Sequence, residues 1–130
     1  MDPELIQSIP GATALLTANG EWPNFADYEV VEVMLIRRGK SWLTITNDCI
    51  DEECDWKPIP ESSIRFEFSS VLGLDLLGYH EQNVIGGLEI TAVENRFKIK
   101  IDYCTGICGE LEVADLRVVV VDDSDADARH

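Results

Sequence analysis

From residue 28 onward, apolar and polar positions follow the period of two that is typical of β-strands. Runs rich in valine, isoleucine and phenylalanine are separated by glycine, asparagine and aspartate, which favour turns. The pattern predicts six strands, at residues 28–37, 42–47, 64–69, 88–93, 97–103 and 110–121. The turns at 94–96 and 105–107 are short, and a parallel crossover needs a dozen or more residues. The C-terminal half is therefore predicted to be an antiparallel meander.

The predicted strands differ in which faces are apolar. Residues 28–37 are apolar on both faces, which predicts a central or doubly covered strand. In three of the other strands one face is apolar and the opposite face is polar, as expected when one side of a sheet is solvated. The residues predicted to face the core in these strands are Leu43, Ile45, Ile64, Phe66, Phe68, Phe97, Ile99, Ile101 and Tyr103.

One helix is predicted, over residues 8–20. Ser8 is the expected cap, Pro10 lies in the first turn, and Gly20 follows the last turn. Residues 72–87 contain four glycines and predict an irregular crossing or a single helical turn at 74–80. The predicted fold is therefore α+β and mostly β: one twisted antiparallel sheet of about six strands with a short N-terminal helix packed on it.

Length and charge narrow the classes of function. The chain has 130 residues, 45% of them hydrophobic, which suits a single domain, expected at residues 1–121. Residues 122–130 are acidic and poor in apolar side chains, which predicts a disordered tail. With 25 acidic and 10 basic residues the formal net charge is -15, which disfavours nucleic-acid and membrane binding and favours a cationic protein partner.

The N-terminus and the apolar runs indicate a cytoplasmic protein. Met1 is followed by acidic residues where a secretory signal needs positive charge. No apolar run approaches the roughly 20 residues of a membrane-spanning helix. In a cytoplasmic protein, cysteines are expected to be thiols and not disulfides.

Two kinds of chemistry can be weighed from the residues. The spacings C-x4-C and C-x3-C are near those of zinc ligands, so a four-cysteine metal site is the first alternative. Its ligands would be Cys49, Cys54, Cys104 and Cys108. The second alternative is a thiol enzyme that uses Cys104 or Cys108 with His80. Free thiols without a ligand are the favoured interpretation, so we expect no metal, no cofactor and no enzymatic activity.

Acidic residues beside aromatic ones provide candidates for partner binding. Residues 48–63 contain prolines and many acids, which predicts an exposed loop. Tryptophan is enriched at binding hot spots, and surrounding charge steers an oppositely charged partner. The predicted contact residues are Asp51, Glu52, Glu53, Asp55, Trp56, Asp27 and Glu29.

Three motifs carry a resemblance to a known family. They are IPGAxALL at residues 9–16, GxWPxFxDxEV at residues 20–30, and QNVIxxLxI at residues 82–90. Together they resemble the Immunity protein 50 family of bacterial polymorphic-toxin systems, over residues 8–121. The position before Asp27 is commonly histidine in that family and is Ala26 here, so no imidazole role transfers to it.

The resemblance implies a small cytoplasmic protein that is made alongside a toxin, binds the toxin domain tightly and performs no reaction. It implies that Trp22, Pro23 and Phe25 pin the corner between helix and strand, and that Asp27 and Glu29 are turn-capping acids or partner contacts. The charge suggests that the toxin is basic, as nuclease domains often are because they attract phosphate. The protein is expected to be a monomer or a homodimer.

Overall fold

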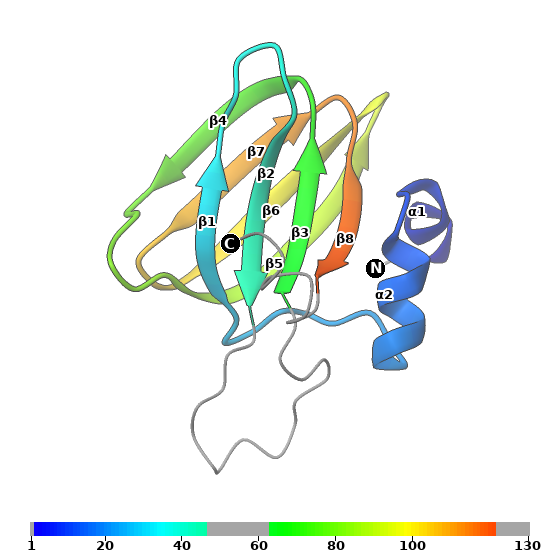
Figure 1. The fold of residues 1–130 in the computed structure, drawn as a ribbon, viewed down its shortest axis with the longest axis horizontal. Coiled ribbons are helices and arrows are strands. Elements are labelled where there is room, and N and C mark those ends of the chain that lie inside the picture. The colour runs from blue at the N-terminus through cyan, green and yellow to red at the C-terminus, as the bar shows by residue number, and fades with distance from the viewer. Residues whose placement is uncertain (1, 47–62, 122–130) are drawn as a thin grey trace.

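Two short helices precede one antiparallel sheet of eight strands in the computed structural model, which describes residues 2–46 and 63–121 (Figure 1). The helices are α1 (Pro3–Ser8) and α2 (Ala12–Asn19). The strands are β1 (Glu29–Met34), β2 (Ser41–Thr46), β3 (Ser63–Phe68), β4 (Val71–Leu77), β5 (Val84–Val93), β6 (Arg96–Thr105), β7 (Cys108–Val113) and β8 (Arg117–Val121). The predicted fold class is confirmed, with eight strands where about six were expected. No helix in the described residues is long and apolar enough to cross a membrane.

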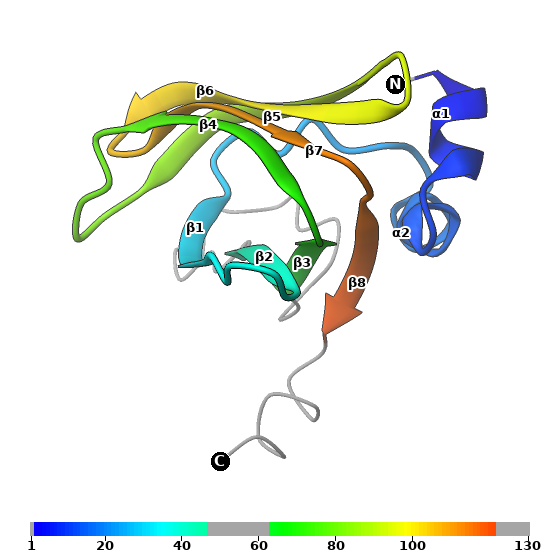
Figure 2. The same ribbon diagram turned by 90° about the horizontal axis from the view of Figure 1, so that it is seen from above.

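The sheet folds over into two layers that enclose the core (Figure 2). Its strand order is β4-β7-β6-β5-β1-β2-β3-β8, so the predicted meander forms as β5, β6 and β7. The first four strands of this order make one layer and the last four make the other (Figure 2). The layers meet between β5 and β1, whose regular pairing is limited to Glu29 and Val84 with backbone bonds on either side, and this short contact lets the sheet bend.

The two layers are also joined at a corner, where the paired strands β3 and β8 of one layer continue into the paired strands β4 and β7 of the other. β3 bends into β4 at Ser69 and Ser70, beside the bend from β7 to β8 at Ala114 and Asp115. The Ser69 backbone N–H donates to the Asp115 carboxylate at 2.8 Å, and the Ser69 hydroxyl donates to the same carboxylate. The Ala114 N–H donates to the Ser70 carbonyl at 3.0 Å. The continuous stretch predicted at 110–121 is therefore two strands, one in each layer.

The core follows the predicted alternation in β2, β3 and the middle of β6. The predicted core residues with 2% exposure or less are Leu43, Ile45, Ile64, Phe66, Phe68, Ile99 and Ile101. Phe97 is half-buried, and the prediction for Tyr103 is wrong because its side chain is 69% exposed. Tyr103 pairs with Ile85, where two register shifts in the pairing of β5 with β6 break the regular alternation.

Three further predictions need correction. The helix predicted at 8–20 is two helices, because Ser8 ends α1 and Gly11, at φ 86°, caps α2. The segment 72–87, predicted to be an irregular crossing or a helical turn, instead contains most of strand β4, which pairs with β7. The strand at 28–37 ends at Met34, and its outer face stays exposed at Val31 because no described helix or strand packs on that face (Figure 2).

Candidate functional site

The first helix is short, and its sequence fixes where it begins and which side it buries. Asp2 is the N-cap, and its carboxylate accepts the Glu4 backbone N–H at 2.9 Å. Pro3 occupies the first helical position, where its missing N–H costs no hydrogen bond. Ile6 is buried, so α1 packs against the core and leaves the carboxylates of Asp2 and Glu4 in solvent.

An aromatic cluster fixes the segment between α2 and β1. Phe25 is 1% exposed and stacks edge-on with three rings: Tyr28 at 5.3 Å, and Trp22 and Phe66 at 5.8 Å each. Edge-to-face pairs at these distances add stability beyond the area that they bury. Pro23 is buried beside them. The cluster therefore holds the corner between helix and strand, the role that the sequence resemblance implied for Trp22, Pro23 and Phe25.

A groove of about 570 Å³ lies where α1, this corner and β5 meet. Its apolar lining residues include Leu5 and Trp22, which are half-buried, and the almost fully buried Leu88 and Ile90. The remaining lining residues are Asp2, Asn24, Glu89, Thr91 and Ala92. Among the described residues that line the groove, the charged ones are two acids and none is a base. We call it the acidic groove.

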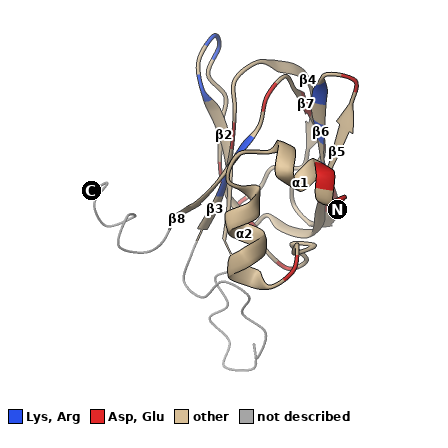
Figure 3. Cartoon of the chain, turned by 90° about the vertical axis from the view of Figure 1, so that its right-hand side faces the viewer, with Lys and Arg blue, Asp and Glu red and all other residues tan. Residues whose placement is uncertain are grey.

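The acids of the groove form no ion pair within 4 Å with a described base, although Lys100 of β6 lies directly opposite Glu89 in the strand pairing. Basic side chains of the sheet are instead matched to acids on adjacent strands, as Arg96 is to Glu112 at 3.5 Å and Lys98 is to Glu110 at 3.7 Å. No described base lies within 4 Å of Asp2 or Glu89. In Figure 3 blue marks the tip of the loop that joins β1 and β2, and further blue lies at β6, whose Lys100 pairs opposite Glu89.

This arrangement suits the binding of a cationic side chain. The floor of the groove is apolar, its charged residues are acids, and the half-buried Trp22 contributes an aromatic ring. A lysine or arginine stem packs well on apolar surface while its charged head meets a carboxylate. A guanidinium group near an aromatic face gains a further cation–π attraction.

The predicted contact residues Asp27 and Glu29 lie on the neighbouring surface and do not line the acidic groove. Asp27 is exposed in a left-handed turn at φ 68°, and its N–H donates to the Ile85 carbonyl at 2.9 Å. Glu29 is half-buried where β1 meets β5. Asp27 therefore has a turn role, and its carboxylate remains open to a partner. The predicted contacts Asp51, Glu52, Glu53, Asp55 and Trp56, like the acidic tail, lie outside the described residues.

The described cysteine and histidine residues of the two alternative sites lie near the ends of β4, β6 and β7. Cys104 is exposed near the end of β6 and Cys108 is half-buried at the start of β7, both as free thiols. No group of three potential metal ligands occurs within residues 2–46 and 63–121. His80 is exposed, and its backbone N–H and carbonyl bond the side chain of Asn83. Cys49 and Cys54 lie outside the described residues.

Sequence reasoning identified Trp22 but missed the acidic groove. Its members come from three segments far apart in the chain, and no local pattern joins them. Two signals were present: the sequence Asp2-Pro3 is a helix start, and Glu89 between Leu88 and Ile90 marks an acid on the outer side of a strand. Comparison with protein-family models, curated proteins and solved structures finds no match for the chain.

Proposed function

We propose that this chain is an immunity protein: a non-enzymatic inhibitor that binds the catalytic domain of a cognate bacterial toxin and neutralises it. The acidic groove carries the proposal, because it combines apolar lining residues, a tryptophan and two carboxylates that form no ion pair within 4 Å with a described base. The sequence resemblance supports the toxin-immunity class, and the net charge of -15 supports a basic target.

In this proposal, a lysine or arginine of the toxin enters the acidic groove beside Trp22. Glu89 and Asp2 meet its positive charge at the rim, and the carboxylates on the surface around it steer the encounter. A basic nuclease domain is the favoured target, because the surface that attracts phosphate would also attract this inhibitor. Covering that surface blocks substrate entry, and no residue of the inhibitor has to react.

The experiment uses the toxin domain encoded beside this chain and measures association rate and affinity by surface plasmon resonance at two salt concentrations. Glu89→Lys places like charge opposite the toxin cation, so we expect the affinity to fall about tenfold or more. The matched control is Glu81→Lys, which makes the same change in net charge at an exposed site outside the groove. It should alter affinity much less.

Two results would contradict this proposal. If Glu89→Lys binds as tightly as the unchanged protein, the acidic groove is not the interface. If both variants lose affinity equally, overall charge governs binding and the groove has no special part. A growth assay that co-expresses the toxin domain adds the functional readout: the unchanged protein should restore growth and Glu89→Lys should restore it less.

A further inference from the structure

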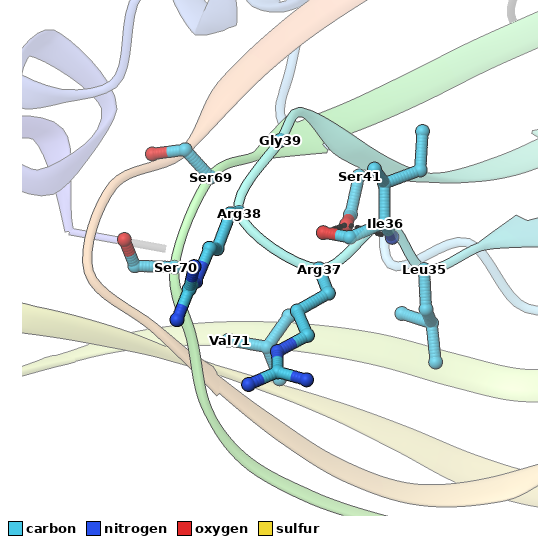
Figure 4. A pocket seen from close by; sticks show the side chains of 9 residues that line it. All are labelled: Leu35, Ile36, Arg37, Arg38, Gly39, Ser41, Ser69, Ser70 and Val71. Atoms are coloured by element: carbon cyan, nitrogen blue, oxygen red, sulfur yellow. Dashed lines mark hydrogen bonds between the residues drawn. The ribbon is translucent and has the colours of Figure 1, made fainter.

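A second cavity, of about 700 Å³, lies where the loop between β1 and β2 faces the start of β4 (Figure 4). The loop contributes Arg37 and Arg38, and the bend before β4 contributes Ser69, Ser70 and Val71. Both guanidinium groups extend toward the side of the cavity that Ser70 and Val71 form (Figure 4). A volume of this size is typical of sites that bind small molecules. The cavity shares no residue with the acidic groove.

The two arginines of this cavity differ from most described bases because they have no acidic partner. Of the eight lysines and arginines within residues 2–46 and 63–121, five form ion pairs within 4 Å with a described acid: Lys40, Arg65, Arg96, Lys98 and Lys100. The other three are Arg37, Arg38 and Arg117. Two of these three line one cavity, in a chain whose net charge is -15. The cavity therefore concentrates positive charge that no described acid neutralises.

A buried serine braces the loop that carries the arginines. Ser41 is 1% exposed, and its hydroxyl accepts the Ile36 N–H at 2.8 Å and donates to the Ile36 carbonyl at 3.3 Å. The Gly39 N–H donates to the same carbonyl at 3.4 Å. Arg38 has φ 61°, in the left-handed region that glycine and asparagine adopt at lower cost. The loop therefore holds a long cationic side chain at a position where a smaller residue would be less strained.

The cavity also has apolar lining residues that are open to solvent. Leu35, Ile36 and Val71 line it and are 45%, 44% and 38% exposed. Removing such side chains from water is favourable, so they suit the apolar part of a ligand. A guanidinium group suits an anionic part, because its N–H donors match the geometry of a carboxylate or a phosphate. Both kinds of surface occur together in this one cavity.

We propose that this cavity binds a small amphipathic anion, whose carboxylate or phosphate head is held by Arg37 and Arg38. The apolar body of the ligand packs against Leu35, Ile36 and Val71. The net charge of -15 favours a small ligand over an acidic protein, because an acidic protein surface would bring many charges that the chain repels. A ligand with one or two charges meets the arginines directly, and salt screens the carboxylates that lie beyond about 8 Å.

The test titrates the full chain with octanoate and with octyl phosphate by isothermal titration calorimetry, and amide chemical shifts locate the site. We expect saturable binding of at least one of these anions, with the largest shifts in residues 35–41 and 69–71. Octanol has the same apolar chain without the charge, and acetate has the carboxylate without the long chain. Each should bind at least tenfold more weakly than the preferred octyl anion, and the tighter of the two octyl anions identifies the head group.

Variants test whether the arginines hold the head group. Arg37→Gln combined with Arg38→Gln should weaken binding of the preferred anion at least tenfold, because both guanidinium contacts are lost. Both side chains are exposed, so the fold should tolerate the changes, which circular dichroism would verify. The matched control combines Arg117→Gln with Lys100→Gln, which removes the same two charges at exposed sites outside the cavity. It should weaken binding by less than about threefold, because salt screens distant charges.

Several results would overturn the inference. One is the absence of saturable binding by either octyl anion at about 5 mM, where even a millimolar site is mostly occupied. Others are equal binding of octanol, chemical shifts confined to a different surface, and unchanged affinity in the variant that lacks both arginines. If a peptide of alternating aspartate and leucine binds this cavity more tightly than either octyl anion, the cavity belongs to a protein partner and the small-ligand proposal is wrong.

Discussion

The hydroxyl of Tyr28 is buried and has no hydrogen-bond partner among the described residues, which makes the stability of the fold at alkaline pH depend on this group. Tyr28 is 1% exposed, and desolvation raises its pKa from 10.0 to about 12. The folded state therefore resists ionisation that the unfolded chain undergoes freely. Because the folded pKa is the higher one, the stabilisation is complete below about pH 10 and is lost as pH rises from about 10 to about 12.

The magnitude follows from the size of the shift. A shift of about 2 units corresponds to about 2.7 kcal/mol over the whole range, of which about 1.4 kcal/mol is lost by about pH 11. The assay is urea unfolding at about pH 8 and about pH 11, with tyrosinate absorbance to follow ionisation. Between these two values of pH, the free energy of unfolding of Tyr28→Phe should fall by about 1.4 kcal/mol less than that of the unchanged protein.

The comparison at about pH 8 provides a second check. Tyr28→Phe removes a buried hydroxyl that bonds no residue in the described part of the chain, so the variant should be as stable as the unchanged protein or more stable. Tyr103→Phe is the control, because Tyr103 is 69% exposed and should leave the pH dependence as it is. If the free energy of unfolding falls equally for Tyr28→Phe and the unchanged protein between the two values of pH, the reasoning is refuted.

Two further predictions concern backbone geometry and buried polar groups, both read from urea unfolding. Gly11→Ala should destabilise the fold by more than about 2 kcal/mol, because its methyl group would overlap the Val118 carbonyl oxygen. Gly20→Ala, at a similar φ of 85° with nothing within 4 Å, should cost only about 1 kcal/mol; equal costs would contradict this account. Asn83→Ala should cost about 2 to 4 kcal/mol, because the buried Asn83 amide bonds the backbone of His80 and Ile107. The exposed Gln82→Ala should be nearly neutral, and a similar loss there would refute the role of Asn83.

Local alternation predicted the strands whose two faces have different surroundings. Leu43, Ile64 and Phe66 alternate with polar residues because one side of their strand faces the core and the other does not. β4 has no such contrast, since its leucines occur on both faces and most of them are exposed. Helix α1 has six residues, too few to establish a helical period, although Asp2 and Pro3 mark its start.

The features that sequence reasoning missed depend on contacts between distant segments. The break between β7 and β8 is fixed by Asp115, whose carboxylate binds Ser69 at the bend between β3 and β4. The acidic groove joins residues near positions 2, 22 and 89, and the cavity at Arg37 joins two loops. The net charge of the chain predicted an acidic binding surface, but only the fold shows that Glu89 and Trp22 line the same groove.

The shared corner has a consequence for how the molecule opens. β3 and β8 pair in one layer while their continuations β4 and β7 pair in the other, so neither layer can detach without breaking hydrogen bonds in both. The layers should therefore behave as one cooperative unit in hydrogen exchange, with similar protection for amides in β2 and β6. Fluctuations should instead begin at the contact between β1 and β5, whose register pair is flanked by only a few backbone bonds, among them Val30 N–H to the Asn83 carbonyl and Ile85 N–H to the Tyr28 carbonyl.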